Sequence, residues 1–315
     1  MEFGFIPIEG PEHFHEALEE VKYGEELGFD SIFIQERHLV KNHFWPTPLL
    51  AASAFLSQTT RMRVGTDILI LPLYHPARLA EEIAVLDIIS QGRFIFGTAI
   101  GYKEDEFALY NVPMEKRGSR FEEGLMLMKK LWTESAAGFE PKPHTKPRPP
   151  VWIGGWKPLM LDRAARLGDA WLPGVSPDIN QVCELKEFFL KKRREAGMPP
   201  PRDWPLTRDV IIAETKAEAR ALAERHILPF YKNVYAGQWK HQFINAEITQ
   251  NLDQLAKDRF IIGDPEEVTK KVKEFIDAYG ATHFICRFFS GDMPHQTIMK
   301  KLKLFAKEVI PRFRP

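Results

Sequence analysis

VGTDILILPLYHPARLAEEIAVLDIISQGRFIFGTAIGY, residues 64–102, contains the pattern that decides the fold. An apolar run at 63–71 stops at a proline and suits a strand buried on both faces, as parallel sheets require. Apolar residues then recur at spacings of three and four from Leu79 to Ile89, which predicts a helix that packs on one side. A second apolar run, 93–100, predicts a strand parallel to the first. Such a unit leaves polar chemistry at the carboxyl ends of its strands.

Strands and helices alternate in the same way along the rest of the chain. Further apolar strands are predicted at 2–8, 31–38, 151–154, 169–172, 206–214 and 282–289, with amphipathic helices between them. Alternations of roughly 40 residues predict an α/β fold, and a (β/α)₈ TIM barrel fits them better than an open doubly wound sheet. The G-x-G-x-x-G fingerprint of the open sheet is also absent. We expect residues 1–315 to form a single domain of this kind.

One segment, 229–262, breaks the alternation. It contains the aromatic residues Phe230, Tyr231, Tyr235, Trp239 and Phe243. We interpret it as an insertion that forms part of a lid or an oligomer contact. Extra core helices are the alternative.

The composition is that of an ordinary globular protein, with 44% hydrophobic and 27% charged residues. Lys plus Arg equals Asp plus Glu at 43 each, so no overall charge favours nucleic acid or an anionic membrane. No apolar run approaches the length of a membrane span, and the N-terminus lacks a signal-peptide pattern, which predicts a cytoplasmic protein. Cys183 and Cys286 have no metal-ligand spacing, so we expect no metal site. A small-molecule substrate is the remaining expectation.

Polar residues follow the predicted strands at the end where a barrel places its active site. The strand 31–38 runs from an apolar part into Glu36, Arg37 and His38, so some of these side chains should enter the barrel mouth. Gly-Gly-Trp-Lys at 154–157 lies between a strand and a helix, and such a helix start binds phosphate or another anion through backbone N–H groups. A plain tight turn is the alternative for this stretch.

These blocks together resemble the bacterial luciferase-like superfamily of flavin-dependent oxidoreductases. The resemblance rests on 64–102, SIFIQERH at 31–38, EFALYNVPMEKRGSRFEEGL at 106–125, PPVWIGGWKPLMLDRAARLGDAWLPG at 149–174 and GDPEEVTKKVKEFIDAYGATHF at 263–284. It covers nearly the whole chain apart from the insertion. It does not specify a substrate.

The resemblance implies a barrel whose mouth holds FMN or, in related branches, the deazaflavin coenzyme F420. It implies a phosphate site near 154–157 and a non-prolyl cis peptide at the end of the third strand, which here is Asp67–Ile68. On these grounds we assign cofactor binding to Ile6, Asp67, Ile68, Gly101, Tyr102, Gly154, Gly155, Trp156 and Lys157.

The candidate catalytic residues are Glu36, Arg37 and His38. Many members of the superfamily carry two successive histidines after an acidic residue here, and the first of them is Arg37 in this chain. A permanently cationic guanidinium cannot act as a general base, but it can stabilise a reduced, anionic flavin or an anionic substrate. His38 either lines the substrate cavity or is a structural residue with satisfied hydrogen bonds.

The activity that the resemblance implies is that of a monooxygenase. Reduced FMN, supplied by a separate flavin reductase, would react with O₂ and oxygenate a small organic substrate. Hydride transfer by coenzyme F420 without oxygen is the alternative, and a non-catalytic flavin-binding barrel, suggested by Arg37, is a second alternative. We also expect a homo-oligomer.

Overall fold

The computed structural model describes residues 1–40, 44–134, 138–289 and 291–314. Strands and helices alternate along the chain, and the described strand pairs run parallel. The strands are β1 (Glu2–Ile6), β2 (Ser31–Ile34), β3 (Arg63–Thr66), β4 (Leu69–Ile70), β5 (Phe94–Ala99), β6 (Val151–Gly154), β7 (Ala170–Leu172), β8 (Pro205–Ile212), β9 (Ile261–Gly263) and β10 (His283–Arg287).

The sheet curls because its first and last strands in sequence lie side by side. The strand order is β7-β6-β5-β3-β2-β1-β10-β8-β9, with β4 paired to β5. β7 and β8 contact each other, although no backbone ladder joins them in the described part of the chain. The α/β barrel predicted from the sequence is therefore confirmed, with its hydrogen-bonded sheet open between these two strands.

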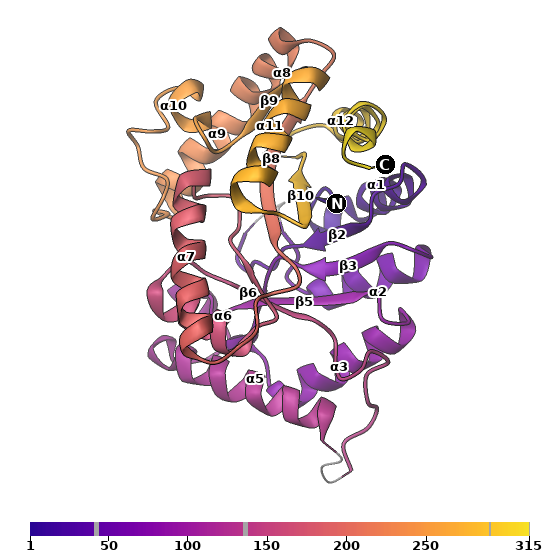
Figure 1. The fold of residues 1–315 in the computed structure, drawn as a ribbon, viewed down its shortest axis with the longest axis vertical. Coiled ribbons are helices and arrows are strands. Elements are labelled where there is room, and N and C mark those ends of the chain that lie inside the picture. Colours follow the sequence, from indigo (N-terminus) through magenta and orange to yellow (C-terminus); the bar gives the residue numbers. More distant parts are fainter. Residues whose placement is uncertain (41–43, 135–137, 290, 315) are drawn as a thin grey trace.

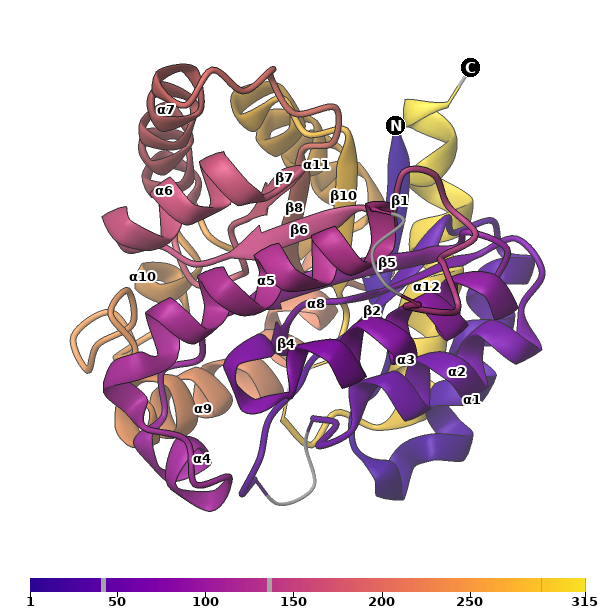
Figure 2. The same cartoon turned by 90° about the horizontal axis from the view of Figure 1, so that it is seen from below.

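Helices surround the sheet on the outside, and the two chain termini lie near each other (Figures 1 and 2). The helices are α1 (Phe14–Glu26), α2 (Pro48–Gln58), α3 (Pro76–Ile89), α4 (Glu104–Leu109), α5 (Arg117–Thr133), α6 (Pro158–Leu167), α7 (Ile179–Glu195), α8 (Lys216–Leu222), α9 (Leu228–Phe230), α10 (Leu252–Ala256), α11 (Pro265–Tyr279) and α12 (His295–Glu308). None of the described helices combines the length and apolar character that crossing a membrane requires.

The unit at 64–102 forms as predicted, with one interruption. The predicted strand 63–71 is divided into β3 and β4 by the peptide bond Asp67–Ile68, which is cis. The prediction of a cis bond at this position is confirmed. The backbones of β3 and β5 lie close together here. A Cβ added to Gly97 on β5 would lie 1.7 Å from the carbonyl oxygen of Thr66, so only glycine fits.

The segment 229–262 is part of the fold rather than a separate appendage. Its end, Ile261 and Ile262, belongs to β9, which pairs with β8. Its apolar side chains form a second core cluster with Ile211 and Ala219. The alternative of extra core structure is confirmed for this buried side, and the opposite side faces the cavity described below.

Candidate active site

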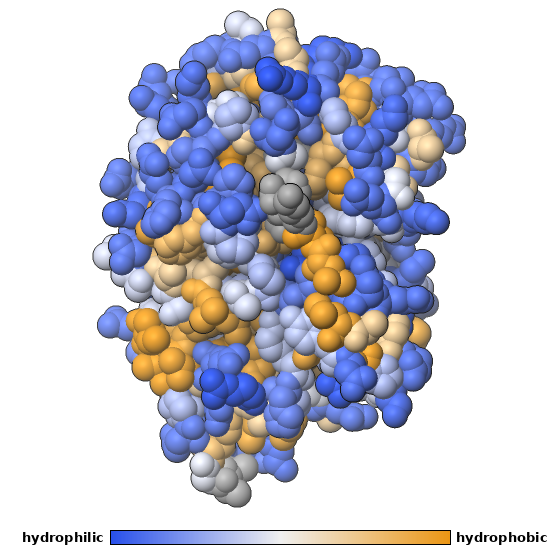
Figure 3. Space-filling model, turned by 180° about the vertical axis from the view of Figure 1, so that it is seen from behind, coloured by the Kyte–Doolittle hydropathy of each residue, from blue (hydrophilic) through white to orange (hydrophobic). Residues whose placement is uncertain are grey.

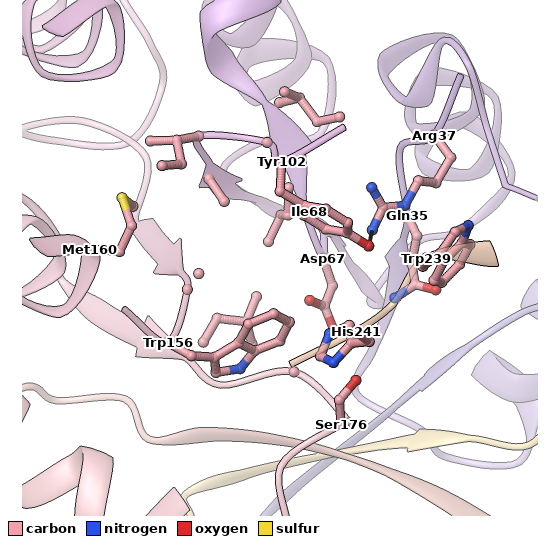
Figure 4. A pocket seen from close by; sticks show the side chains of 18 of the residues that line it. Gln35, Arg37, Asp67, Ile68, Tyr102, Trp156, Met160, Ser176, Trp239 and His241 are labelled. Carbon is pink, nitrogen blue, oxygen red and sulfur yellow. Dashed lines mark hydrogen bonds between the residues drawn. The ribbon is translucent and has the colours of Figure 1, made fainter. Parts of the chain in front are cut away.

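A cavity of about 370 Å³ opens at the carboxyl ends of the strands. Its walls come from the ends of β2, β5, β6 and β7, from the bend between β3 and β4, and from the segment that follows α9. Figure 4 shows side chains from these separate elements converging on one space. The lining includes Gln35, Glu36, Arg37, Asp67, Ile68, Tyr102, Arg117, Gly154, Gly155, Trp156, Lys157, Tyr235, Trp239 and His241.

Arg37 lies at the mouth, as predicted from its place at the end of β2. Its guanidinium donates a hydrogen bond to the Tyr102 hydroxyl and lies 4.5 Å from the centre of that ring and 5.0 Å from the Trp239 ring (Figure 4). Its Nη1 is 3.8 Å from the buried Glu106 carboxylate. The aromatic rings and the acid therefore hold a fixed positive charge beside the cavity.

Glu36 reaches the cavity wall, but its carboxylate is occupied by the protein itself. It accepts hydrogen bonds from the Ile70 N–H, from the Tyr74 hydroxyl at 2.7 Å and from Nε2 of His38 at 3.0 Å. These contacts tie the end of β2 to β4 and to the loop before α3. The carboxylate has the environment of a structural anchor.

The structure does not bring His38 or Ile6 to the cavity wall in the described part of the chain. His38 is buried between Glu36 and Tyr110, whose hydroxyl lies 3.1 Å from Nδ1. This agrees with the structural alternative for His38. Ile6 is the last residue of β1, and its side chain is fully buried in the main core cluster, so its side chain is unavailable to a ligand in the cavity. The other predicted cofactor-binding residues do line the cavity.

A glycine-rich corner forms the side of the cavity next to α6. Gly155 has a φ of 134°, a conformation that side chains rarely adopt, and an added Cβ would lie 2.9 Å from Cβ of Met160. The Trp156 indole N–H donates to the Pro173 carbonyl, which fixes that ring as a wall between β6 and β7. Because α6 begins directly after Lys157, its positive end faces this corner.

Arg117, the first residue of α5, reaches the cavity wall too. Its Nη1 donates to the Met114 carbonyl at 2.8 Å, while its buried Nε has no partner in the described structure. This nitrogen has no accessible surface, so a ligand oxygen would be bound by the part of the guanidinium that lines the cavity. In the sequence, Arg117 was indicated only as part of the stretch 106–125, which carries the resemblance.

Sequence reasoning missed the wall contributed by Trp239 and His241. His241 packs against Trp156 with ring centroids 4.7 Å apart. Burial, reinforced by the positive charge of Arg37, lowers the pKa of His241 to about 4, so this ring is neutral at physiological pH. The aromatic run of the segment was visible in the sequence, but nothing in its pattern indicated which rings turn toward the cavity.

A buried polar cluster fixes that segment to the barrel. Arg287 on β10 donates two hydrogen bonds to Asp209 on β8, at 2.6 and 2.9 Å. It also donates to the hydroxyls of Tyr231 and Tyr235, both at 2.9 Å. The two tyrosine rings stack with centroids 4.3 Å apart. The cavity wall at Tyr235 is therefore positioned by the strand ends themselves.

The described residues contain no cluster of three or more histidine, cysteine, aspartate or glutamate side chains placed to hold a metal ion. The polar groups of the cavity are instead suited to organic and phosphate groups. The cavity combines aromatic walls with a glycine-rich helix start and guanidinium groups.

Comparison with known proteins gives a consistent result. Residues 2–283 match the family described as luciferase-like monooxygenase. An F420-dependent glucose-6-phosphate dehydrogenase of Amycolatopsis mediterranei is 26% identical, with 92% of each chain covered. The oxygenase component of a flavin-dependent trigonelline monooxygenase from Acinetobacter baylyi is also 26% identical, over 95% of this chain and 90% of that one.

A solved structure supports the fold over the same length. The monooxygenase RslO1 from Streptomyces bottropensis superposes with a TM-score of 0.85 at 24% identity, over 99% of this chain and 100% of that one. Two proteins that are this similar in backbone and this different in sequence share an architecture, while their substrates can differ.

Proposed function

Because the chain belongs to the luciferase-like monooxygenase family, we propose that it is an oxidoreductase that uses reduced FMN and O₂ to oxygenate a small organic substrate. The observation that carries the proposal is the cavity at the strand ends, which joins a glycine-rich helix start to aromatic walls and a fixed positive charge. The non-catalytic alternative has no support from this cavity.

The residues present fit a flavin mononucleotide. Gly154 and Gly155 leave room beside α6, and the start of that helix together with Arg117 would hold the phosphate. Ile68 and Trp156 would contact the ring system from opposite walls. When bound, the cofactor supplies the electrons. The chain itself supplies orientation, a cavity that excludes bulk water and the polar groups around the substrate.

Coenzyme F420 is the second candidate cofactor. The observation in its favour is the similarity to an F420-dependent dehydrogenase at the same level as to a flavin-dependent monooxygenase. With F420 the reaction would be hydride transfer without O₂. The start of α6 and Arg117 would bind the phosphate of either cofactor.

Partners and assembly belong to the same proposal. A separate flavin reductase would deliver reduced FMN, as the name of the trigonelline enzyme's oxygenase component suggests for that protein. The two free cysteines suit a reducing compartment, which supports a cytoplasmic location. The pairing of β1 with β10 supports one domain over residues 1–315.

We also propose that the protein forms a homodimer through α3. Val85, Ile88 and Ile89 are 43%, 41% and 52% exposed. Their spacing of three and four places them on one face of the helix. Apolar side chains gather on the side of the molecule where α2 and α3 lie, in the lower left of Figure 3. A contiguous exposed apolar strip of this kind is typical of an interface, and a second copy offers a matching surface.

Spectroscopic titration tests the proposed function. The purified protein is titrated with FMN, with reduced FMN under anaerobic conditions and with F420, and absorbance and tryptophan fluorescence are followed. We expect one cofactor to bind and to quench the fluorescence of Trp156 and Trp239, which line the cavity. A Trp156→Phe variant should lose part of that quenching. Oxygen consumption with a flavin reductase then separates oxygenation from hydride transfer. Failure of both cofactors to bind would contradict the proposal.

A further inference from the structure

Asp67 places a carboxyl group on the floor of the cavity. The residue lies in the bend between β3 and β4, is only 7% exposed, and its backbone N–H donates to the Ile34 carbonyl at 2.8 Å. Figure 4 shows its carboxyl directed into the cavity, toward the ring of His241. The backbone is therefore held in the sheet while the carboxyl faces the space for a ligand.

One carboxyl oxygen of Asp67 is anchored and the other is available. The hydroxyl of Thr207, a fully buried residue of β8, donates to Oδ2 at 2.9 Å. No group donates to Oδ1 in the described part of the chain, and this atom is not among the fully buried oxygens that lack a partner. Oδ1 therefore has accessible surface in the cavity.

Glu36, the second acid on the wall of the described cavity, has no carboxyl oxygen without a hydrogen-bond partner in the protein. Both of its carboxyl oxygens accept hydrogen bonds from the protein, as shown above. The neutral ring of His241 and the tyrosines Tyr102 and Tyr235, whose pKa values burial raises, do not release or take up a proton near neutral pH. Asp67 differs from these groups.

Burial raises the pKa of the Asp67 carboxyl to about 7, although the Thr207 hydroxyl and the charge of Arg287 act in the opposite direction. Charged groups face this region from several elements. They are Glu9 after β1, Glu36 and Arg37 after β2, Asp209 on β8 and Arg287 on β10. Arg287 is neutralised by its two hydrogen bonds to Asp209, so burial outweighs it.

We propose that the Asp67 carboxyl is the general acid of the reaction in this cavity, a role that rests on the oxidoreductase function proposed above. With reduced FMN, the proton on Oδ1 passes to the oxygen atom of O₂ that is not inserted into the substrate and that leaves as water. With F420, it passes to a substrate oxygen or nitrogen atom whose double bond to carbon is reduced when the carbon accepts hydride. The carboxyl O–H bond breaks and a new O–H or N–H bond forms. The carboxylate regains a proton from water when the product leaves. The electrons come from the reduced flavin or deazaflavin cofactor, and the carboxyl is neither oxidised nor reduced.

The titration of Asp67 can be measured without a cofactor. Difference infrared spectra of the protein should show a carboxyl signal that ionises with a midpoint near pH 7 and that Asp67→Asn removes. Thr207→Val removes the donor to Oδ2, so it should move the midpoint upward. Burial also raises the pKa of Glu9, which lies outside the cavity wall, so Glu9→Gln should remove a different carboxyl signal and leave the one that Asp67→Asn removes. Absence of this titration from the wild type would overturn the proposal.

The pH dependence of stability is a second measurement of this titration. Because the folded pKa is raised above the unfolded value, the protonated carboxyl contributes its full stability below about pH 4. That contribution is lost as the pH rises toward about 7. The thermal midpoint of the wild type should therefore fall relative to Asp67→Asn across this window. A constant difference between the two proteins would contradict the titration.

Single-turnover rates test the catalytic role. For a protein that donates from Asp67, the rate of the chemical step should fall as the pH rises through about 7. Asp67→Asn should lower the rate by roughly 10²-fold or more and abolish that dependence. Asn keeps the shape of the side chain and the backbone of the bend, so the affinity for the cofactor should remain near the wild-type value. Binding retained with an unchanged rate and pH profile in Asp67→Asn would overturn this role alone, whereas a wild type that binds neither cofactor would contradict the proposed function.

Discussion

Three consecutive residues at the end of β2 have three different roles. The Glu36 carboxylate accepts hydrogen bonds from neighbouring backbone and side chains. Arg37 lines the cavity, and His38 is buried away from the cavity. The sequence predicted that charged residues would emerge here but could not divide the roles, because the partners lie 34 to 72 positions away in the chain. Only the folded structure shows which side chain already has hydrogen-bond partners within the protein.

Replacing Glu36 tests its role as an anchor. Glu36→Gln leaves one acceptor oxygen where two are used, and it presents an amide to the Ile70 N–H or the Tyr74 hydroxyl. We expect the free energy of unfolding to fall by roughly 2–4 kcal/mol, measured by urea denaturation. The exposed Glu104→Gln should change it by no more than about 0.5 kcal/mol. Unchanged stability with lost turnover would instead make Glu36 a catalytic group.

Among the elements, the division of the predicted strand 63–71 into β3 and β4 matters most for the cavity. A continuous strand over 63–71 was predicted from its apolar run. The resemblance implied a cis bond at Asp67–Ile68, but the division into β3 and β4 was not predicted. The pattern of apolar residues is the same for a straight and a divided strand. Asp67 lies between β3 and β4 and accepts a hydrogen bond from Thr207, which is 140 positions away, and neither stretch alone indicates this contact.

The exposed face of α3 gives a prediction about assembly. Ile88→Glu places a charge in the proposed apolar contact, so sedimentation should show a dimer for the wild type and a monomer for the variant. Leu159→Glu is a matched control, because Leu159 is an exposed apolar residue of α6. A monomeric wild type, or an Ile88→Glu variant that remains a dimer, would contradict the proposed interface.

For the whole molecule, the sequence was informative where a local pattern repeats. The alternation of strands and helices predicted the barrel, and the strand ends located most of the cavity wall. The segment 229–262 resisted prediction because its contacts are long-range: Tyr235 is 52 positions from Arg287, and His241 packs on Trp156 from another part of the barrel. Such contacts form only when the sheet curls into a barrel, and no short stretch of the sequence contains this information.

The central claim is that the corner formed by α6 and Arg117 binds the phosphate of the cofactor. The most direct test is to measure the affinities of FMN and riboflavin for the wild type, for Arg117→Met and for Lys116→Met, whose exposed side chain lies outside the cavity wall. We predict that Arg117→Met weakens FMN binding roughly tenfold or more and leaves riboflavin binding unchanged, because only FMN carries the phosphate. Lys116→Met should match the wild type. Equal affinity of Arg117→Met and the wild type for FMN, or an equal loss for FMN and riboflavin, would contradict the claim.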